Sequence, residues 1–556
     1  MEIVIKSEFD KLCESIINRK LEEHYETKSI VDTDFVISFE ITNGTENDSY
    51  EHIKTDCGVL IRGSGKLGVL YGIGGLLRSS RLRNNKIEFT LKKDKFIPLK
   101  PLRGMYIATH FFNFYHCAPI EEVERYIEDL ALYGINTLFV WYDMHHYNGI
   151  DQPEAVEMIK RLKQILNKGK ELGMKTGFTM IANEAFADSP VKARGEWQKG
   201  KYGYYNDIPV YRLEVCPSKE CGAQYIVDSR TDVIKAFADI EPDYAMLWPY
   251  DQGGCQCEDC APWGGNGFLT ACEKCSDIIR EYWPKAKIII STWYFDTAID
   301  GEYDMMIEKF KAKKYSDYLL ADALRFIYPP YILKKGVAGK LPLLGFAEIS
   351  MYGATPWGGY GANPQPAMLE YYWNQVKDIH AGNIPYSEGI FEDMNKYIYA
   401  ELYSRKDANV RELVKEYISY EFTEEMADVL TDAMYLLEKT IMRNSNHNKD
   451  FKVTFLYPED ITPAYEIIMK ADAVMDDKRK NGMRWQFIKQ RAIVDYELYK
   501  NGGYMNETAN NALEILEAIY HGENAIREIS NPTFRKLAMY KFDFTGITGC
   551  PVFDRR

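Results

Sequence analysis

Residues 103–146 read RGMYIATHFFNFYHCAPIEEVERYIEDLALYGINTLFVWYDMHH, and this stretch decides the fold. It begins with a short apolar run, continues through the amphipathic segment IEEVERYIEDLALYG, and ends in a second apolar run, INTLFVWYDM. Short apolar runs favour buried strands, whereas apolar residues spaced three and four apart favour a helix. The stretch therefore predicts a strand, a crossover helix and a second strand.

The same rhythm continues along the chain. A second amphipathic segment, AVEMIKRLKQILNKGKELG, leads to six further strand candidates: KTGFTMIANE, YAMLWPYD, KIIISTWYFD, DYLLADAL, LLGFAEISMYG and NIPYSEGIF. With the first two they make eight strand candidates. Eight strands with helical crossovers is the count of a (β/α)8, or TIM, barrel of the α/β class.

The sequence on either side of the barrel has a different pattern. DFVISFEI and CGVLIRG alternate apolar and polar residues, and GKLGVLYGIGGLLRSS begins a glycine-punctuated helix. The charges and two prolines of KKDKFIPLKPLRG mark a boundary. Beyond about residue 400, RELVKEYISYEFTEEMADVLTDAMYLLEKTI and ETANNALEILEAIYHGENAIREI have helical spacing and strands stop. We therefore expect an α+β domain over 1–97, the barrel over 98–400 and an α-helical domain over 401–556.

The chain is long and acidic. Its 556 residues exceed what one compact core normally holds, and its formal net charge is -14. Nucleic acids and anionic membranes are bound by clustered Lys and Arg, so this charge argues against both as partners. The first residues, MEIVIKSEFDKL, lack a basic segment followed by an apolar one, and no later run has the length of a membrane span. We expect a cytoplasmic protein, and leave homo-oligomerisation open.

Acidic residues follow almost every predicted strand. In a TIM barrel the chemistry takes place at the carboxyl ends of the strands, where the loops surround one concave mouth. Any single acid there is equally well explained as a helix cap or an ion-pair partner. As a set, however, they predict an active site. The acids are Asp143, Glu184, Asp251, Asp296, Glu348, Glu388, Glu392 and Asp393.

Aromatic residues lie beside these acids. They are usually core residues at a strand end, but a mouth that combines acids with aromatic rings suits a sugar, which stacks its C–H faces on rings and hydrogen-bonds through its hydroxyls. His145 and His146 are candidates for contacts to hydroxyls, although an exposed or merely hydrogen-bonded pair explains them equally well. The predicted substrate-binding aromatic residues are Trp141, Trp248, Trp293, Tyr294, Tyr352, Trp357 and Tyr386, with Tyr142 and Tyr250 beside them.

Three stretches resemble a known group of enzymes over roughly residues 30–400. GVLIRGSGKLGVLYGIGGLLR resembles the non-catalytic α+β domain that precedes the barrel in family 20 β-hexosaminidases and in α-glucuronidases. The stretch at residues 103–146 is similar to their first barrel unit, and YSEGIFEDMNK is similar to the last barrel strand of hexosaminidase-like glycosidases. The resemblance implies a glycosidase that needs no cofactor for catalysis, because two carboxyl groups are sufficient for glycoside hydrolysis.

One position departs from the family 20 pattern. Those enzymes carry adjacent Asp and Glu after the fourth strand, whereas this chain has Asp251 followed by Gln252. The acetamido-assisted mechanism is therefore not carried over. The resemblance instead implies a carboxyl pair across the mouth. We assign Asp251 as the general acid, because its aromatic and apolar surroundings would raise its pKa. Glu348 is the nucleophile or base, and Glu388 competes for that role or orients a sugar hydroxyl.

Several functions compete at this point. The first is a β-N-acetylhexosaminidase-like glycosidase, followed by an α- or β-glucuronidase-like enzyme. A non-catalytic carbohydrate-binding barrel is a third reading. A metal-dependent hydrolase is the weakest, because the histidines near the predicted strand ends form no His-x-His or Glu-x-x-His pattern. The partner expected in each of the first three cases is a carbohydrate.

Cysteines are concentrated after the fourth predicted strand. Cys255, Cys257 and Cys260 form a C-x-C-x-x-C motif, and thiolates at this spacing can bind one tetrahedral ion. We predict a structural zinc site completed by Cys216 or by Cys221 on the preceding loop, and take Cys216 as the fourth ligand.

Simple burial is the alternative to metal binding for the remaining cysteines of this region. Cys272 and Cys275 lie in the stretch FLTACEKCSDIIREYW, which has helical periodicity. Eleven cysteines in the chain is an odd number, which makes a disulfide framework the weaker use of them.

Overall fold

The computed structural model of the protein describes most of the chain. The described residues are 2–25, 30–31, 35–44, 48–84, 86–92, 94–109, 113–196, 213–249, 254–296, 299–323, 328–347, 349, 364–446 and 452–522.

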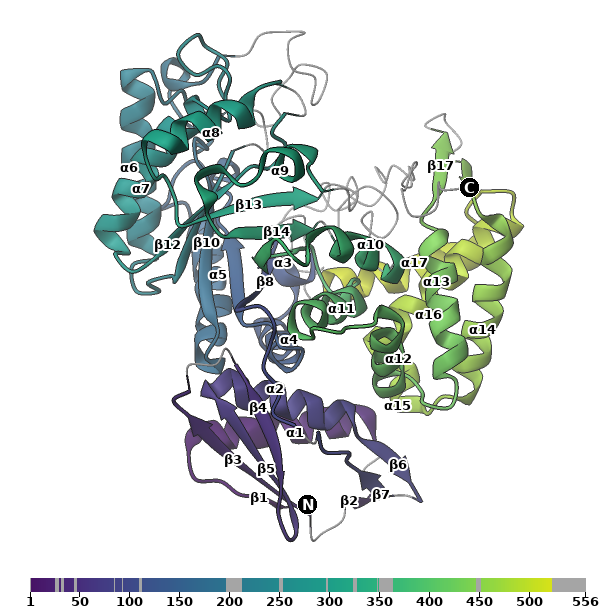
Figure 1. Ribbon diagram of the computed structural model, residues 1–556. Helices are drawn as coiled ribbons and strands as arrows, with labels where there is room; N and C mark the ends of the chain where they lie inside the picture. Colours follow the sequence, from purple (N-terminus) through teal and green to yellow (C-terminus); the bar gives the residue numbers. More distant parts are fainter. Residues whose placement is uncertain are drawn as a thin grey trace.

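A closed parallel barrel forms the middle of the molecule (Figure 1). Its strand order is β15-β14-β13-β12-β11-β10-β9-β8-β16, and β15 also pairs with β8, which closes the ring. The TIM-barrel prediction is confirmed. The eighth strand is split into two short segments, both parallel to β8. The strands are β8 (Leu102–Ile107), β9 (Thr137–Trp141), β10 (Lys175–Ile181), β11 (Tyr244–Trp248), β12 (Lys287–Ser291), β13 (Tyr318–Ala323), β14 (Leu343–Ala347), β15 (His380–Asn383) and β16 (Tyr386–Ser387).

Helices connect successive strands around the outside of the barrel. In α5 (Pro153–Leu172), for example, Pro153 begins the helix and Gly173 ends it in the left-handed conformation, with φ at 90°. The other helices are α3 (Phe114–Cys117), α4 (Ile120–Leu132), α6 (Glu220–Ala236), α7 (Gly267–Tyr282), α8 (Glu302–Ala312), α9 (Pro330–Lys335), α10 (Pro366–Val376) and α11 (Asp393–Ser404).

The N-terminal region is a small α+β domain, as predicted. A four-stranded sheet has the order β1-β3-β5-β4, and α1 (Glu8–His24) and α2 (Gly65–Arg78) lie between it and the barrel (Figure 1). A Cβ at Gly74 would lie 2.0 Å from the carbonyl oxygen of Leu132, so only glycine lets α2 approach the end of α4. The strands are β1 (Glu2–Ile3), β3 (Val36–Thr42), β4 (Tyr50–Lys54) and β5 (Gly58–Ser64), with β2 (Ile30–Val31), β6 (Arg81–Arg83) and β7 (Lys86–Glu88) in a second sheet.

The C-terminal region is mainly helical, as predicted, but the expectation that strands stop after residue 400 is wrong in one place. An antiparallel pair, β17 (Arg443–Asn446) and β18 (Lys452–Phe455), follows α13. Alternation of buried and exposed residues in KVTF suits a strand with one face covered. The helices are α12 (Val410–Glu421), α13 (Ala427–Lys439), α14 (Ile461–Val474), α15 (Asp477–Asn481), α16 (Met483–Lys500) and α17 (Glu507–His521).

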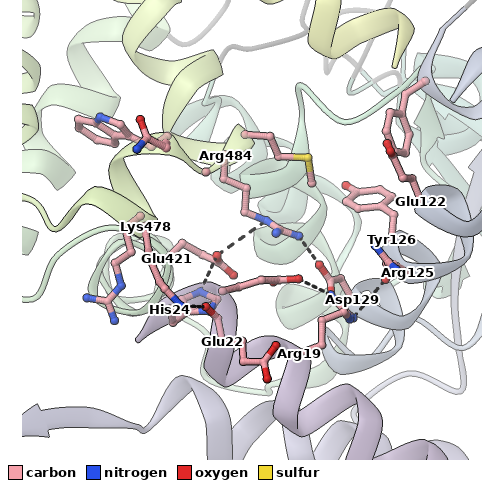
Figure 2. A pocket seen from close by; sticks show the side chains of 17 residues that line it. Arg19, Glu22, His24, Glu122, Arg125, Tyr126, Asp129, Glu421, Lys478 and Arg484 are labelled. Atoms are coloured by element: carbon pink, nitrogen blue, oxygen red, sulfur yellow. Dashed lines mark hydrogen bonds and ion pairs between the residues drawn. The ribbon is translucent and has the colours of Figure 1, made fainter. Parts of the chain in front are cut away.

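A buried ion network joins the three regions (Figure 2). Arg484, on α16, lies 2.7 Å from Asp129 on α4 and 2.7 Å from Asp393 on α11. Asp129 in turn lies 2.8 Å from Arg19 on α1. His24 of α1 pairs with Glu421 of α12 at 3.0 Å. All of these residues except Asp393 line a pocket between α1, α4 and α16, and their contacts join the flanking domains to the barrel.

A further contact ties the helical region to the barrel. Glu438, on α13, accepts hydrogen bonds from the backbone N–H groups of Ala367 and Met368 at 2.9 and 2.8 Å. These N–H groups lie in the first turn of α10 and have no partner within that helix. Glu438 therefore caps a barrel helix from outside the barrel. No helix in the described part of the chain has the length and apolar character needed to cross a membrane.

Candidate active site

Aromatic rings fill the barrel interior near the carboxyl ends of the strands. The centre of the Phe346 ring, on β14, lies 4.8 Å from that of Trp248, on β11, and 5.9 Å from that of Tyr386, on β16. Trp293, directly after β12, lies 5.7 Å from Trp248. Trp248 and Trp293 are buried, whereas Tyr386 is partly exposed. Three of the predicted substrate-binding rings thus share one cluster with Phe346.

Tyr294 has a strained backbone beside this cluster. Its φ is 67°, a left-handed conformation that costs a bulky residue about 1–3 kcal/mol. Its ring lies 4.9 Å from that of Trp293. Strain of this kind concentrates at binding and catalytic sites. The turn after β12 therefore presents two neighbouring aromatic residues at the mouth.

Glu184, after β10, organises the neighbouring strand end. Its Oε2 accepts a hydrogen bond of 3.1 Å from Nε1 of Trp141, and its Oε1 lies 2.7 Å from Nδ1 of His145. Oε1 also accepts the backbone N–H of His145 at 3.3 Å. All three side chains are buried. The structure therefore brings the predicted Trp141 and His145 together around one carboxylate whose orientation is fixed.

His146 forms a second imidazole–carboxylate pair. Its Nδ1 lies 2.6 Å from Oδ2 of Asp143. Burial disfavours the charged imidazole, but attraction to the Asp143 carboxylate and the hydrogen bond between them raise the pKa of His146 above its ordinary value. The His146 side chain is 47% exposed, whereas that of Asp143 is 4% exposed. Asp143 thus holds the partly exposed ring of His146 in place and favours its protonated form.

Glu388 follows β16, the segment that pairs with β8. Its Oε1 accepts a hydrogen bond of 2.6 Å from the Tyr386 hydroxyl. Glu388 is buried, and its partner Tyr386 belongs to the aromatic cluster. The helix-cap alternative does not apply to it, because α11 begins only at Asp393. Glu388 therefore stands at the mouth with one oxygen held by a phenol.

Three other predicted acids serve the framework. Asp296 accepts the backbone N–H of Glu302 at 2.8 Å and so caps α8. Glu392 accepts a hydrogen bond of 2.6 Å from the Ser387 hydroxyl, and it is fully buried. Asp393 is held by Arg484 and by three phenol hydroxyls. The contacts of these acids match the structural alternative, a cap or an ion-pair partner. The phenols are those of Tyr126, Tyr133 and Tyr417.

Asp322 is an acid of the mouth that reasoning from strand ends missed. It lies in β13, in register with Phe346 of β14. Side chains in parallel register share one face of a sheet, so Asp322 faces the barrel interior as Phe346 does. Burial raises the pKa of Asp322 to about 7. The sequence contains a signal that could have identified Asp322, namely an acid within the apolar run YLLADA. Buried parallel strands are normally continuous hydrophobic runs, so an acid inside one stands out.

Four predicted site residues lie outside the described residues. They are the two carboxyl groups assigned as acid and nucleophile, and two of the aromatic residues. Their assignments stay predictions from the sequence. These residues are Asp251, Glu348, Tyr352 and Trp357, and Tyr250, named beside the predicted rings, also lies outside the described residues.

Four cysteines converge on the loops that follow β10 and β11. Cys216 lies just before α6, and Cys255, Cys257 and Cys260 lie between β11 and α7. The four sulfur atoms all lie within 4.8 Å of one another. In the described part of the chain, this is the group of cysteine, histidine and acidic residues that could hold a metal ion. The structure brings together all four predicted ligands.

The remaining cysteines of this region lie elsewhere. Cys221, the alternative to Cys216, is on α6, where its sulfur lies 3.4 Å from the carbonyl oxygen of Lys192. Cys272 and Cys275 are buried on α7, as the burial alternative predicts.

Comparisons by sequence found no counterpart. No protein-family profile matches the chain. No curated protein matches it either.

Comparison with solved structures found many proteins of similar fold. A family GH115 4-O-methyl-alpha-glucuronidase with specificity for decorated arabinogalactans has a TM-score of 0.64 at 12% identity, over 100% of this chain and 81% of that one. A family 89 glycoside hydrolase from Clostridium perfringens, in complex with 2-acetamido-1,2-dideoxynojirimycin, has a TM-score of 0.57 at 14% identity, over 92% of this chain and 66% of that one. A family 20 beta-N-acetylglucosaminidase has a TM-score of 0.51 at 14% identity, over 75% of this chain and 90% of that one. These likenesses establish a shared fold.

Proposed function

We propose that the protein is a glycoside hydrolase that works at the mouth of its barrel. The observation that carries the proposal is that carboxyl groups and aromatic rings share this mouth. Glu388 is bonded to Tyr386, whose ring belongs to the cluster of Phe346 and Trp248. A sugar needs both partners, since its C–H faces stack on rings and its glycosidic bond is cleaved by a pair of carboxyl groups. The structurally similar proteins named above are glycoside hydrolases, which supports the proposal.

The proposed chemistry uses one protonated and one ionised carboxyl group. Asp251 donates a proton to the leaving oxygen, and Glu348 attacks the anomeric carbon or activates water. Glu388, held by Tyr386 at 2.6 Å, orients a sugar hydroxyl or replaces Glu348. Asp322, with a pKa raised to about 7 by burial, is protonated below neutral pH and is a second candidate for the acid.

The proposed sugar rests on likeness to known glycosidases. The sequence resembles family 20 β-hexosaminidases, and a family 20 beta-N-acetylglucosaminidase shares the fold. We therefore place an N-acetylhexosaminide first. An α-glucuronide is second, on the likeness to the GH115 enzyme.

A panel of 4-nitrophenyl glycosides tests this proposal. We expect release of nitrophenol from an N-acetylhexosaminide and none from the α- and β-glucuronides. The Glu388→Gln protein, purified in the same way, controls for a contaminating hydrolase and should be at least about 100-fold slower. If only a glucuronide were cleaved, the proposed substrate would be a glucuronide and not an N-acetylhexosaminide. Binding of N-acetylglucosamine without turnover of any glycoside would instead make the protein a carbohydrate-binding barrel.

A further inference from the structure

The four cysteines of the loop cluster are arranged as ligands of one ion. The sulfur of Cys216 lies 3.7 Å from that of Cys257 and 3.8 Å from that of Cys260. A disulfide would require about 2.05 Å. Four sulfurs at the corners of a tetrahedron, each about 2.3 Å from a central zinc ion, lie about 3.8 Å apart. These two separations match the edge of that tetrahedron, and all four sulfurs lie within 4.8 Å of one another.

The surroundings of the sulfurs suit thiolates. The backbone N–H of Glu196 donates to Cys255 at 3.4 Å, and the hydroxyl of Ser218 lies 3.1 Å from the Cys260 sulfur. Donors of this kind orient metal-bound thiolates and offset their charge.

The cluster is largely buried, and its four candidate ligands are all sulfur atoms. Cys216, Cys255 and Cys260 are fully buried, and Cys257 is partly buried. Four thiolates fill a tetrahedral shell and leave no position for a reactive water. Soft ligands in this geometry select zinc or iron over magnesium or calcium. We propose that Cys216, Cys255, Cys257 and Cys260 bind one structural Zn²⁺ ion that fastens the loop after β10 to the loop after β11.

The connections around the cluster show what the ion would hold. A backbone hydrogen bond from Gln256 N–H to Glu196 O at 2.9 Å joins the two loops close to the cluster. A second one, from Gly195 N–H to Glu214 O at 2.7 Å, joins two parts of the loop after β10. On the β11 side, Nε1 of Trp263 donates to the carbonyl oxygen of Pro249 at 2.7 Å. The loop after β10 begins with Glu184 at the mouth. The ion would therefore fix the outer ends of two loops whose inner ends reach the proposed active site.

Metal analysis of the full-length protein, purified without added zinc, tests the site. We expect about one zinc ion per chain, released when a mercurial reagent blocks the thiols. This measurement needs no variant, so it stands even if a substituted protein fails to fold. Protein that folds without bound metal, and whose four thiols react freely, would overturn the proposal. Bound iron with its visible thiolate absorption would overturn the choice of zinc.

Two cysteine variants distinguish ligands from bystanders. Cys216→Ser should lose most of the bound zinc, whereas the matched control Cys221→Ser, five residues along the same chain segment, should retain about one ion. Removal of zinc by a strong chelator should lower the melting temperature of the wild-type protein and of Cys221→Ser. Equal zinc content in both variants would contradict the ligand set. The outcome is independent of the proposed glycosidase function, because neither readout involves a sugar.

Discussion

The hydroxyl of Tyr386 donates a hydrogen bond of 2.6 Å to Oε1 of Glu388, two residues further along the segment that closes the barrel. The tyrosine ring also lies against Phe346 inside the barrel. One residue thus contacts both the aromatic cluster and a carboxylate, so the pair links the rings that could stack on a sugar to a group that could act on it.

Substitution at this pair should separate chemistry from folding. Glu388→Gln should lower kcat at least about 100-fold. Tyr386→Phe, which removes one hydrogen bond to a charged group, should lower it about 10- to 100-fold. Steady-state kinetics and melting temperature would be measured together, with Tyr499→Phe, 43% exposed on α16, as a control expected to match wild type. Wild-type kinetics in Glu388→Gln would remove this residue from the proposed machinery.

The predicted acid can be identified by its dependence on the leaving group. Asp251→Asn should slow hydrolysis of a 4-methoxyphenyl glycoside strongly and that of a 2,4-dinitrophenyl glycoside much less, because a good leaving group needs little protonation. Glu348→Gln should slow both substrates, and change ligand affinity little. If Asp251→Asn slowed both substrates equally while Asp322→Asn showed the leaving-group dependence, the acid would be Asp322.

Asp322 should make the stability of the protein depend on pH. Burial raises its pKa from 3.8 to about 7 in the folded state, so between these values the unfolded chain ionises while the folded chain stays protonated. The free energy of unfolding therefore falls as the pH rises. The contribution of Asp322 to this fall reaches about 4 kcal/mol above pH 7. Asn resembles the protonated form. The stability gained by Asp322→Asn should grow from about zero at pH 4 to its maximum at pH 8.

Urea unfolding at several pH values measures this difference. Asp304→Asn is the matched control, because the Asp304 side chain is 61% exposed beside Lys335 and should give a difference that varies little with pH. A gain from Asp322→Asn that stays constant between pH 4 and pH 8 would contradict the buried protonated carboxyl group.

Arg484 should contribute strongly to stability. Arg484→Met would leave the buried Asp129 and Asp393 carboxylates without their shared guanidinium, and breaking a buried ion pair from one side costs about 3–5 kcal/mol. Arg411→Met removes an exposed arginine that pairs with Asp432, and should cost about 1 kcal/mol or less. Equal melting temperatures for the two variants would show that the network at the domain junction does not hold the domains.

Periodicity alone was sufficient to predict the barrel, because each strand is a short apolar run and the crossover helices are amphipathic. It could not predict the division of the last strand, which depends on how β15 and β16 meet β8. Nor could it predict β17 and β18, two four-residue strands in an otherwise helical region.

The candidate metal site could be predicted in part, because the spacing of its cysteines is visible in the sequence. The motif formed by Cys255, Cys257 and Cys260 predicts three of the proposed ligands, but the place of the fourth depends on a bridge between Arg194 and Val215 that turns the loop back toward them. Acids were harder to assign. Asp296 and Glu388 both follow a predicted strand, so the sequence makes them equally good candidates for catalysis. Only the hydrogen bonds that Asp296 accepts from backbone N–H groups of α8 show that Asp296 caps this helix.

The cap that Glu438 places on α10 bears on the order in which the chain can fold as it is synthesised. The ribosome makes α10 and both segments of the closing strand before it makes α13, so the first turn of α10 has no carboxylate acceptor when it first emerges. Uncapped first turns fray. The cap on this segment of the barrel wall, next to the closing strand, can therefore form only after residue 438 has been made, although the neighbouring strands precede it in the chain.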